Sequence, residues 1–480
     1  MSMAKGIKRD LLILGGGVGG LVVASVASQL GLKVTLIEDN DRLGGDCLHH
    51  GCVPSKALLH CARLFHQQRR AAARGLGGAA EPVVDIGAVN AYIRSVIDTL
   101  QEYDDPERFR SYGCEVLFGR GHFITPDRVE VNGEVRKGRR IVIATGSSPL
   151  IPPVEGLKEA GFLTNESMFS LEAVPGHLAI LGGGPIGIEM AQAFRRLGSK
   201  VTVLLRGETI LSNDDPELAA MLQKRLVEEG ISFAANSELL RVEKAQGGGR
   251  RLTLELPGGE SHLHVDELLV ATGRRPNTGN LNLAAAEVEE QRKGVVVDKH
   301  LRTTNRRIYA CGDVCGPYRF THMAEYQAGI VISNALFRFP KSVDYSLVPW
   351  VTYTDPELAA VGLSEQQARA QGLDVEVLHF PFRSIDRAVI EGESIGQTKL
   401  VVHKGKILGA AILGPSAGEL LHEIVLAMKS GSTIRTLAET IHAYPTLSQI
   451  HRSTVNTHYS GKLFSPLSRT LVQLLTRLLP

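Results

Sequence analysis

The sequence predicts an α/β protein with two doubly wound domains and a smaller α+β domain at the C-terminal end. The first observation is a repeat, because an apolar strand, a glycine turn and a helical pattern occur at Leu11–Gly20 and again at Leu178–Gly187. A second strand follows each repeat, at Lys33–Glu38 and Lys200–Leu205, which completes a β–α–β unit twice. From about Leu347 the pattern changes to alternating strands and then helices, as expected of an antiparallel sheet covered by helices.

Length and composition are those of a large globular protein. A chain of 480 residues suggests about three domains, and its net charge of +2 favours neither nucleic acid nor an acidic substrate. Met1–Asp10 lacks the apolar core of a secretory signal, and no stretch approaches the roughly 18 apolar residues of a membrane span, so we expect a cytoplasmic protein. Six cysteines do not make a disulfide scaffold in so long a chain, and a close pair is more often catalytic.

The first glycine turn predicts a dinucleotide site. Gly15 makes the tight turn, Gly17 lets the backbone approach a pyrophosphate, and Gly20 packs the helix on the strand. Free N–H groups at the helix start favour the negative charge, and Glu38 at the end of the second strand can hold a ribose 2′-hydroxyl. Glycine turns also join strands to helices for structural reasons alone, but the flanking elements and the spaced acid favour the dinucleotide.

The second glycine turn predicts a different nucleotide. Gly182, Gly184 and Gly187 repeat the pattern, but the following strand ends in Arg206 and has no acid at the ribose position. Because an arginine can pair with a 2′-phosphate, NADPH is preferred and NADH remains possible. The alternative is that Arg206 is a solvated residue at the strand end.

The strongest motif is a cysteine pair. Cys47 and Cys52 open a helix after a glycine turn, and Lys56 follows with a fixed positive charge. A helix N-terminus lowers a thiol pKa, so such a pair is suited to disulfide exchange. Two buried free thiols are the less favoured alternative.

Taken with these motifs, residues 9–460 resemble the class I pyridine nucleotide-disulfide oxidoreductases, such as dihydrolipoamide dehydrogenase, glutathione reductase and mercuric reductase. The resemblance implies one FAD per subunit at the first glycine turn, and a second FAD motif at 303–313 in which Asp313 binds the ribityl chain. The further positions that it assigns to cofactor binding are Gly45, Asp46, Lys56, Gly121, Thr145, Gly146, Gly273 and Thr321.

The resemblance also implies a mechanism. Hydride passes from nicotinamide to flavin, which reduces a redox-active disulfide between Cys47 and Cys52. Cys52 resembles the charge-transfer thiolate and Cys47 the interchange thiol, while Lys56 would lie beside the flavin and pair with Glu189. Segment 349–362 resembles the start of an interface domain, so a homodimer is expected in which the partner completes each active site.

The expected domains follow the family order. The predicted ranges are 1–150 and 276–345 for FAD binding, 151–275 for NAD(P) binding, 346–462 for the dimerisation interface, and 463–480 for a C-terminal tail.

The acid/base segment departs from the family pattern. Where dihydrolipoamide dehydrogenases carry His-x-His-Pro-Thr-x-x-Glu, this chain has Tyr444 at the catalytic histidine position and Gln449 at the glutamate position. A tyrosine with a pKa near 10 is a poor base at neutral pH. His442 matches the family's first histidine and is a candidate substitute base, but a hydrogen-bond donor role for Tyr444 is favoured.

Three functions remain open. The favoured one is a dihydrolipoamide-dehydrogenase-like enzyme acting on a small dithiol, a disulfide or a lipoyl-bearing protein. The second is a mercuric-reductase-like enzyme that reduces a soft metal ion held by thiolates, although no cysteine follows Cys315. The third is a low-turnover redox sensor. No resident metal site is expected.

The tail carries a helical apolar stripe in Leu467–Leu479, with arginines and polar residues opposite. Packing of this stripe on the protein itself or on a dimer partner is favoured over peripheral contact with a membrane surface.

Overall fold

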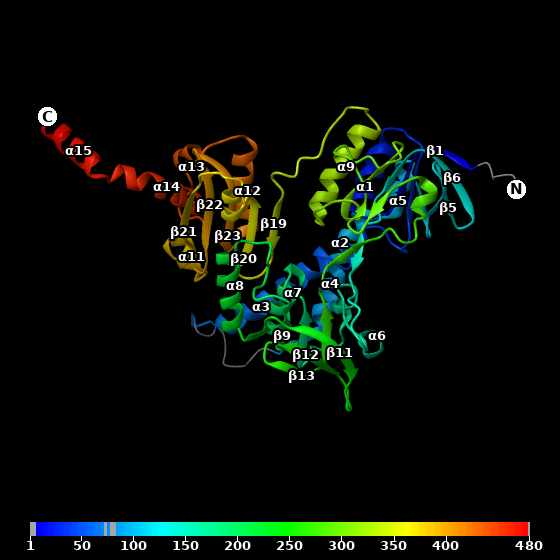
Figure 1. Cartoon of the computed structure of the whole chain (residues 1–480), viewed down its shortest axis with the longest axis horizontal. Helices are drawn as coiled ribbons and strands as arrows, with labels where there is room; N and C mark the ends of the chain where they lie inside the picture. Colours follow the sequence, from blue (N-terminus) through cyan, green and yellow to red (C-terminus); the bar gives the residue numbers. More distant parts are fainter. Residues whose placement is uncertain (1–5, 72–73, 77–82, 479–480) are drawn as a thin grey trace. The chain divides into compact units, whose positions relative to one another are not determined.

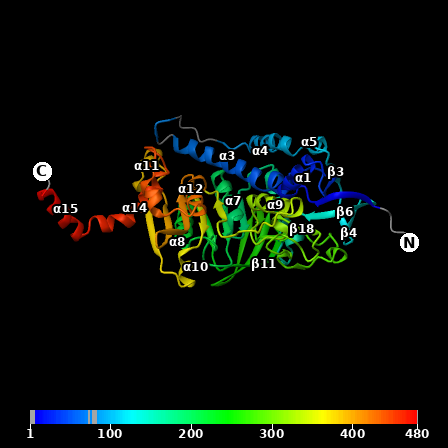
Figure 2. The ribbon, with the colours of Figure 1, turned by 90° about the horizontal axis from the view of Figure 1, so that it is seen from above.

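The computed structural model describes residues 6–71, 74–76 and 83–478, which form two compact units. The first unit comprises Met1–Pro175 and Glu267–Asp344, and the second comprises Gly176–Asp266 and Tyr345–Pro480. Figures 1 and 2 follow the chain through both units by colour. The finer division into domains stays a prediction.

The first unit is built on one mixed sheet. Its parallel strands are β1 (Ile7–Leu14), β2 (Val34–Glu38), β3 (Glu115–Phe118), β6 (Glu134–Ile143) and β18 (Ile308–Ala310), and the antiparallel strands are β4 (His122–Thr125) and β5 (Arg128–Val131). The order along the sheet is β3-β2-β1-β6-β5-β4, with β18 also paired to β6. β1 is therefore central, and its fully buried residues 11–14 explain why this strand is continuously apolar.

The helices of this unit carry the candidate site. They are α1 (Val18–Gln29), α2 (Gly45–His49), α3 (Cys52–Ala71), α4 (Ile86–Gln101), α5 (Pro106–Ser111) and α9 (Thr321–Ala335). Of these, α1, α5 and α9 pack on the sheet, while α2, α3 and α4 pack on one another. α1 and α9 pack side by side, and residues from both join one core cluster with β1 and β2. This packing brings the N-terminus of α9 to the part of the unit that holds the first glycine turn.

The second unit begins with the repeated β–α–β unit. The parallel strands are β8 (His177–Leu181), β9 (Lys200–Leu204) and β10 (Ile231–Ala234), and the helices are α7 (Pro185–Arg196) and α8 (Pro216–Glu228). A separate antiparallel sheet follows, with strands β11 (Glu238–Lys244), β12 (Arg250–Leu256) and β13 (Gly259–Val265).

The remainder of the second unit is α+β, as the sequence predicted. Its antiparallel sheet runs in the order β19 (Pro349–Thr352), β20 (Glu357–Gly362), β23 (Lys406–Gly414), β22 (Gln397–His403) and β21 (Glu376–Pro381). The helices are α10 (Glu365–Ala370), α11 (Asp386–Glu391), α12 (Ala417–Lys429), α13 (Ile434–Glu439), α14 (Gln449–Leu463) and α15 (Pro466–Leu478). The predicted α/β fold class with a third α+β part is confirmed.

The C-terminal tail differs from one expectation. The predicted amphipathic helix is present as α15, drawn in red in Figure 1, although Leu479 lies outside the described residues. Its leucines are exposed, so in the described part of its own unit the stripe is not packed, and packing on a dimer partner stays a prediction. The helix follows α14 and extends away from the sheet of its own unit, and each described residue from Arg469 to Leu478 is exposed (Figures 1 and 2).

Both glycine turns use the same packing device. A Cβ built on Gly20 would lie 1.9 Å from the carbonyl oxygen of Gly15, and one built on Gly187 would lie 2.2 Å from that of Gly182. Any side chain at Gly20 or Gly187 would therefore separate the helix from the turn. The two turns share one physical reason for the third glycine of the motif.

Candidate active site

The first glycine turn leaves a helix N-terminus available for an anion. Gly17 is the N-cap of α1 in extended conformation, and no side chain caps the helix. Gly15 has a φ of 108°, which a residue with a side chain rarely adopts. First-turn N–H groups and the helix dipole together suit a pyrophosphate. The turn therefore fits the dinucleotide that the sequence predicts there.

Glu38 lies where the sequence placed it, at the end of β2. Its Oε2 accepts a hydrogen bond of 2.6 Å from the Gly16 N–H, and its Oε1 accepts from the Asn40 N–H at 2.9 Å. The carboxylate is almost fully buried beside the glycine turn. It is thus held by backbone donors at the position from which a ribose is bound in this kind of domain.

The two cysteines lie on consecutive helices beside the glycine turn. Cys47 is in α2 and Cys52 begins α3, while the Gly44 N–H donates 2.9 Å to the Gly16 carbonyl. The Thr321 hydroxyl at the N-terminus of α9 donates to Cys47 Sγ at 3.0 Å and lies 3.6 Å from Cys52 Sγ. Both sulfurs are thiols in this structure. The predicted pair is therefore brought together with one shared hydroxyl.

The two thiols are not equivalent. Hydrogen bonding to Cys52 and burial raise the pKa of Cys47 well above its usual range, and the Thr321 hydroxyl opposes this rise. The raised pKa keeps Cys47 in its thiol form in the reduced pair.

Asp46 is held by two side chains from other parts of the unit. Arg274 Nη2 lies 2.9 Å from Asp46 Oδ2, and Asn165 Nδ2 donates 3.1 Å to Asp46 Oδ1. The same Asn165 amide donates 3.1 Å to the carbonyl of His50. The backbone on both sides of Cys47 is therefore fixed by side chains distant in sequence.

Arg274 also reaches the second FAD motif. Its Nε donates 2.7 Å to Ser147 Oγ, and that hydroxyl donates 2.6 Å to Asp313 Oδ2. Burial raises the pKa of Asp313, whereas the Ser147 hydrogen bond and the charges of Arg274 and Arg319 lower it. One guanidinium thus links the carboxylate before Cys47 with the carboxylate expected at the ribityl chain.

The other predicted cofactor positions are close-packed or in loops of the first unit. Thr145 Oγ1 donates 2.8 Å to the Asn277 carbonyl, and the Asn277 N–H donates 3.0 Å to that of Gly146. A Cβ on Gly121 would lie 3.0 Å from Leu14 Cδ2, and Gly273 has a φ of 122°. Thr145, Gly146 and Gly273 lie in two Ala-Thr-Gly segments, 144–146 after β6 and 271–273 after β14 (Glu267–Val270), whereas Gly121 directly precedes β4.

The second glycine turn likewise ends on an uncapped helix. Gly184 is the extended N-cap of α7, and a Cβ built on it would meet no atom within 4 Å. Arg206 is exposed just beyond the end of β9. The turn therefore fits a second dinucleotide, with an accessible guanidinium near the end of the following strand.

One face of α7 is bound to the segment between β19 and β20. Glu189 Oε1 accepts 2.9 Å from the Tyr353 N–H, and the Gln192 amide exchanges two hydrogen bonds of 2.8 Å with the Asp355 backbone. Arg196 Nη1 lies 2.7 Å from Asp355 Oδ2. These three α7 residues are all buried, which holds the helix and the Glu189 carboxylate in place.

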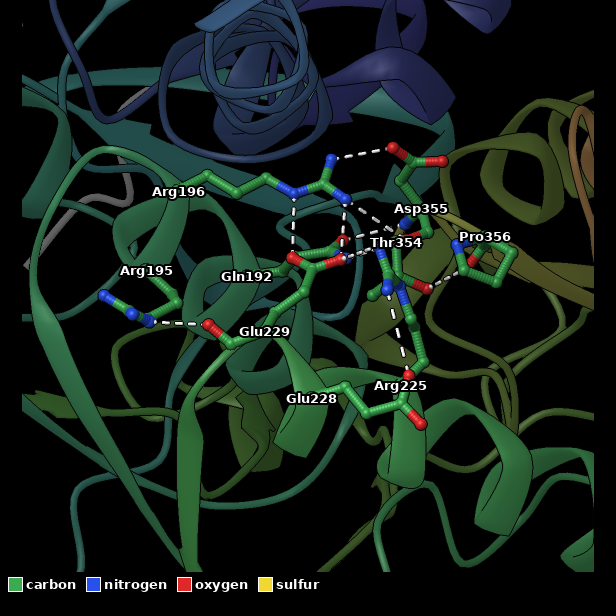
Figure 3. A network of polar contacts seen from close by, with 9 residues as sticks. All are labelled: Gln192, Arg195, Arg196, Arg225, Glu228, Glu229, Thr354, Asp355 and Pro356. Carbon is green, nitrogen blue, oxygen red and sulfur yellow. Dashed lines mark hydrogen bonds and ion pairs between the residues drawn. The ribbon is translucent and has the colours of Figure 1, made fainter. Parts of the chain in front are cut away.

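Figure 3 shows the ionic part of this anchor. Arg196 donates from Nε to Glu229 Oε2 at 3.0 Å and from Nη2 to Glu229 Oε1 at 2.9 Å. Arg225 lies 3.2 Å from the same Glu229 carboxylate. Lys56 is in the first unit and Glu189 in the second, so their predicted pairing stays a prediction.

Tyr444 and His442 lie in the segment that departs from the family's acid/base pattern, and each contacts other groups of the same subunit. Tyr444 is exposed and its hydroxyl donates 2.8 Å to Asp386 Oδ2, which raises the pKa of the phenol. His442 Nε2 lies 3.0 Å from Glu423 Oε1, and His442 Nδ1 lies 3.1 Å from the Thr440 carbonyl. Both ring nitrogens of His442 therefore face acceptor oxygens within the subunit.

Asn165 and Arg274 were missed by the sequence interpretation. Their signals were an acid directly before Cys47, which needs a partner, and an arginine directly after the second Ala-Thr-Gly. Thr321, expected only at the cofactor, contacts the two sulfurs as well.

The first unit places a pair of thiols beside an uncapped glycine turn, and the second unit has an uncapped glycine turn of its own, a combination expected of a redox enzyme that uses two dinucleotides and a dithiol. Family comparison agrees, since "Pyridine nucleotide-disulphide oxidoreductase" matches residues 9–328 and its "dimerisation domain" matches residues 348–454. The chain belongs to this family. It is therefore a flavin-dependent oxidoreductase that uses FAD and NAD(P)H, and its dimerisation domain supports a homodimer.

Similar proteins carry several names. A mercuric reductase of Lysinibacillus sphaericus is 36% identical over 92% of this chain and 81% of its own length. A dihydrolipoyl dehydrogenase of Chlamydia muridarum is 37% identical over 92% of this chain and 95% of its own length. The structure of the HOCl-induced flavoprotein disulfide reductase RclA from Escherichia coli superposes with a TM-score of 0.85 at 29% identity, covering 93% of this chain and 99% of that one.

Proposed function

We propose that this chain is an NADPH:disulfide oxidoreductase whose dithiol, Cys47 and Cys52, exchanges with a small dithiol or disulfide of the lipoyl type. The observation that carries the proposal is the placement of both sulfurs around the Thr321 hydroxyl, beside the first glycine turn. Bound FAD supplies the relay of two electrons between the nicotinamide and this pair. The residues described below determine which sulfur meets the substrate and how protons are held.

Disulfide exchange at the pair can be written so that atoms and electrons balance. Cys47, after losing its proton, attacks one sulfur of a substrate disulfide and releases the other as a thiolate. Cys52 then attacks Cys47 Sγ, which releases the second substrate sulfur and leaves a Cys47–Cys52 disulfide. Two electrons from NADPH and two protons restore the dithiol. The reverse sequence oxidises a dithiol.

The proton held on Cys47 sets the requirement for an acid/base group. Because the pKa of Cys47 is raised by Cys52 and by burial, exchange needs a group that accepts this proton. Asp386 keeps Tyr444 protonated, so the phenol is unsuited to that task. We propose that Tyr444 instead hydrogen-bonds the bound substrate, and that His442 is held by Glu423 in a positioning role.

Choice of nucleotide rests on Arg206. Its exposed guanidinium, just beyond β9, supports recognition of a 2′-phosphate, and the position that corresponds to the acid Glu38 of the first glycine-turn domain is the uncharged Leu205, directly before it. NADPH is therefore the proposed donor, with NADH as a weaker one.

Anaerobic mixing with dihydrolipoamide tests the proposed substrate class. Dihydrolipoamide should produce the thiolate-to-flavin long-wavelength band in the oxidised enzyme, and NADPH should produce the same band. Tyr444→Phe should slow the band with dihydrolipoamide but not with NADPH, and Tyr459→Phe serves as the matched control. If only NADPH produces the band, the lipoyl class is wrong while the electron path stands. Rapid NADPH oxidation on adding Hg(II) would then favour the mercuric-reductase-like alternative.

A further inference from the structure

The C-terminal helix α15 presents one continuous apolar face. At about 100° per residue, its leucines fall within an arc of about 100°. They are Leu467, Leu471, Leu474, Leu475 and Leu478, with exposed fractions from 44% to 81%. Arg469, Gln473 and Thr476 occupy the opposite side.

Hydrogen bonds and a proline near its N-terminus stabilise the start of α15, and contacts of its apolar face do not. Ser465 Oγ accepts 3.3 Å from the Ser468 N–H, and Pro466 occupies the first turn. Ser468 Oγ donates 2.9 Å to the Lys462 carbonyl at the end of α14. Within the described part of the chain, every residue from Arg469 to Leu478 is exposed. An aligned face of five exposed leucines is unusual for a surface helix that serves only as a terminus.

The charged residues of the C-terminal segment that contains α15 are all basic. The last acidic residue is Glu439, so the final 41 residues contain none, although the whole chain has 51. Arg452, Lys462, Arg469 and Arg477 lie in this segment. Basic residues beside an apolar helical stripe are the combination that binds an anionic lipid surface.

We propose that α15 lies flat on an anionic phospholipid surface, with its leucines in the headgroup–acyl boundary. Arg477, at the flank of the leucine arc, reaches the phosphates, and Arg469 on the opposite side adds positive charge near the surface. Thirteen residues span only about 20 Å, which is shorter than the roughly 30 Å hydrocarbon core, so the helix lies in the interface and does not cross it. Among the described residues no helix is long and apolar enough to span a membrane. A second copy of this chain has a net charge of +2, so it offers no overall electrostatic attraction for the basic C-terminal segment.

Vesicle cosedimentation of the full-length holoenzyme tests this inference. Wild type should pellet with vesicles of equal phosphatidylglycerol and phosphatidylcholine, and less with pure phosphatidylcholine. The double variant Leu471→Gln with Leu475→Gln should lower partitioning at least tenfold, because two leucines that would be buried in the lipid are lost. Arg469→Gln with Arg477→Gln should lower it several-fold on the anionic vesicles only. Val227→Gln with Leu426→Gln, which removes exposed aliphatic residues from α8 and α12, should change nothing.

Three results would overturn the inference. Wild type could remain in the supernatant with anionic vesicles, the leucine pair could bind as well as wild type, or both vesicle types could bind equally. If the leucine pair instead weakens the dimer in sedimentation velocity and wild type ignores vesicles, a second copy covers the face. The test does not depend on substrate turnover, so its failure leaves the proposed function untouched.

Discussion

Arg274 Nη2 lies 2.9 Å from Asp46 Oδ2, so the residue directly before Cys47 is tied to a loop far along the chain. The guanidinium also lies near Asp313, with 3.9 Å between Arg274 Nε and Asp313 Oδ2. One positive charge therefore separates two carboxylates that would otherwise repel each other beside the first glycine turn. This relationship makes the position of the cysteine pair depend on Asp313, in the segment predicted to be a second FAD motif.

The first prediction is that Asp46 and Arg274 are energetically coupled. Arg274→Gln leaves Asp46 and Asp313 as uncompensated neighbours, and we expect faster loss of FAD and a stability loss of about 1–3 kcal/mol. Asp46→Asn in the same protein should recover part of both losses, because it removes one of the two negative charges. Flavin retention after gel filtration and urea midpoints for both single variants and the double variant measure the coupling. Additive effects would show that the pair acts independently.

The second prediction concerns Cys52. Cys52→Ser should keep FAD but lose the long-wavelength band on reduction, because the sulfur that would face the flavin is absent. Cys47→Ser is the matched variant, and it should keep the band while losing disulfide exchange. Absorbance spectra under anaerobic reduction decide between them. If the band persists in Cys52→Ser, the roles assigned to the two cysteines are reversed, and Cys47 supplies the thiolate that faces the flavin.

The parts of the candidate site that depend on local sequence were predictable. The glycine turns, Glu38 and the cysteine pair were found because each depends on neighbours within one β–α–β unit or one helix start. Asn165 and Arg274 were not found, because their function comes from where distant loops meet in the folded unit. The apolar stripe of α15 could be predicted from the helical spacing of its leucines. Whether that stripe is exposed depends on which elements lie next to it in the folded chain.

The acid/base segment shows the same limit. The replacement of the family's histidine and glutamate by Tyr444 and Gln449 was readable from the aligned motif. The new partners, Asp386 for Tyr444 and Glu423 for His442, come from α11 and α12 and have no sequence signal near residue 444. A changed motif therefore predicts an altered acid/base site, and the structure was needed to find the groups that contact Tyr444 and His442.

The third prediction is a switch in nucleotide preference. Arg206→Glu should repel a 2′-phosphate and hydrogen-bond a ribose 2′-hydroxyl, so the ratio of kcat/KM for NADPH to that for NADH should fall at least tenfold. Arg195→Gln, also in this domain, is the control and should leave the ratio unchanged. Steady-state kinetics with both nucleotides suffice. An unaltered ratio in Arg206→Glu would remove this residue from the nucleotide site.

The fourth prediction is a pH-dependent cost at Asp214. Burial raises the pKa of this carboxyl to about 6 from 3.8, although the Trp350 indole donates 2.7 Å to its Oδ1. A raised pKa means that the folded state binds more protons, so this group's contribution to stability is complete below about pH 4 and is lost as pH rises through about 6. Its cost at neutral pH is at most about 3 kcal/mol.

Asp214→Asn keeps an oxygen for the indole and removes the charge. Relative to wild type, the variant should therefore be more stable at pH 7.5 and show a smaller gain, or none, at pH 4.5. Urea midpoints at the two pH values measure the difference, and Asp98→Asn on exposed α4 is the control. Equal gains at both pH values would mean that ionisation of Asp214 is not the cause.

The fifth prediction concerns the buried ionic anchor of α7. Arg196 satisfies Glu229 with two hydrogen bonds and Asp355 with an ion pair, and its side chain is only 4% exposed. Arg196→Met removes this partner from Glu229, whose side chain is 6% exposed, and from Asp355, whose side chain is 20% exposed, which should cost at most about 3–5 kcal/mol because Arg225 still pairs with Glu229. Arg196→Lys should recover only a minor part, because an ammonium cannot make the forked contact with Glu229 and reach Asp355 as well.

Function should respond to this anchor through Glu189. Since Gln192 and Glu189 hold the same 353–355 segment, loosening Arg196 should allow α7 to shift and slow flavin reduction by NADPH in stopped-flow measurements. Lys200→Met, at an exposed position after the same helix, controls for loss of a positive charge. A variant that loses stability but reduces flavin at the wild-type rate would limit Arg196 to a structural role. A slower reduction with unchanged NADPH affinity would instead place the effect on the geometry of electron transfer, because binding of the nucleotide would be intact.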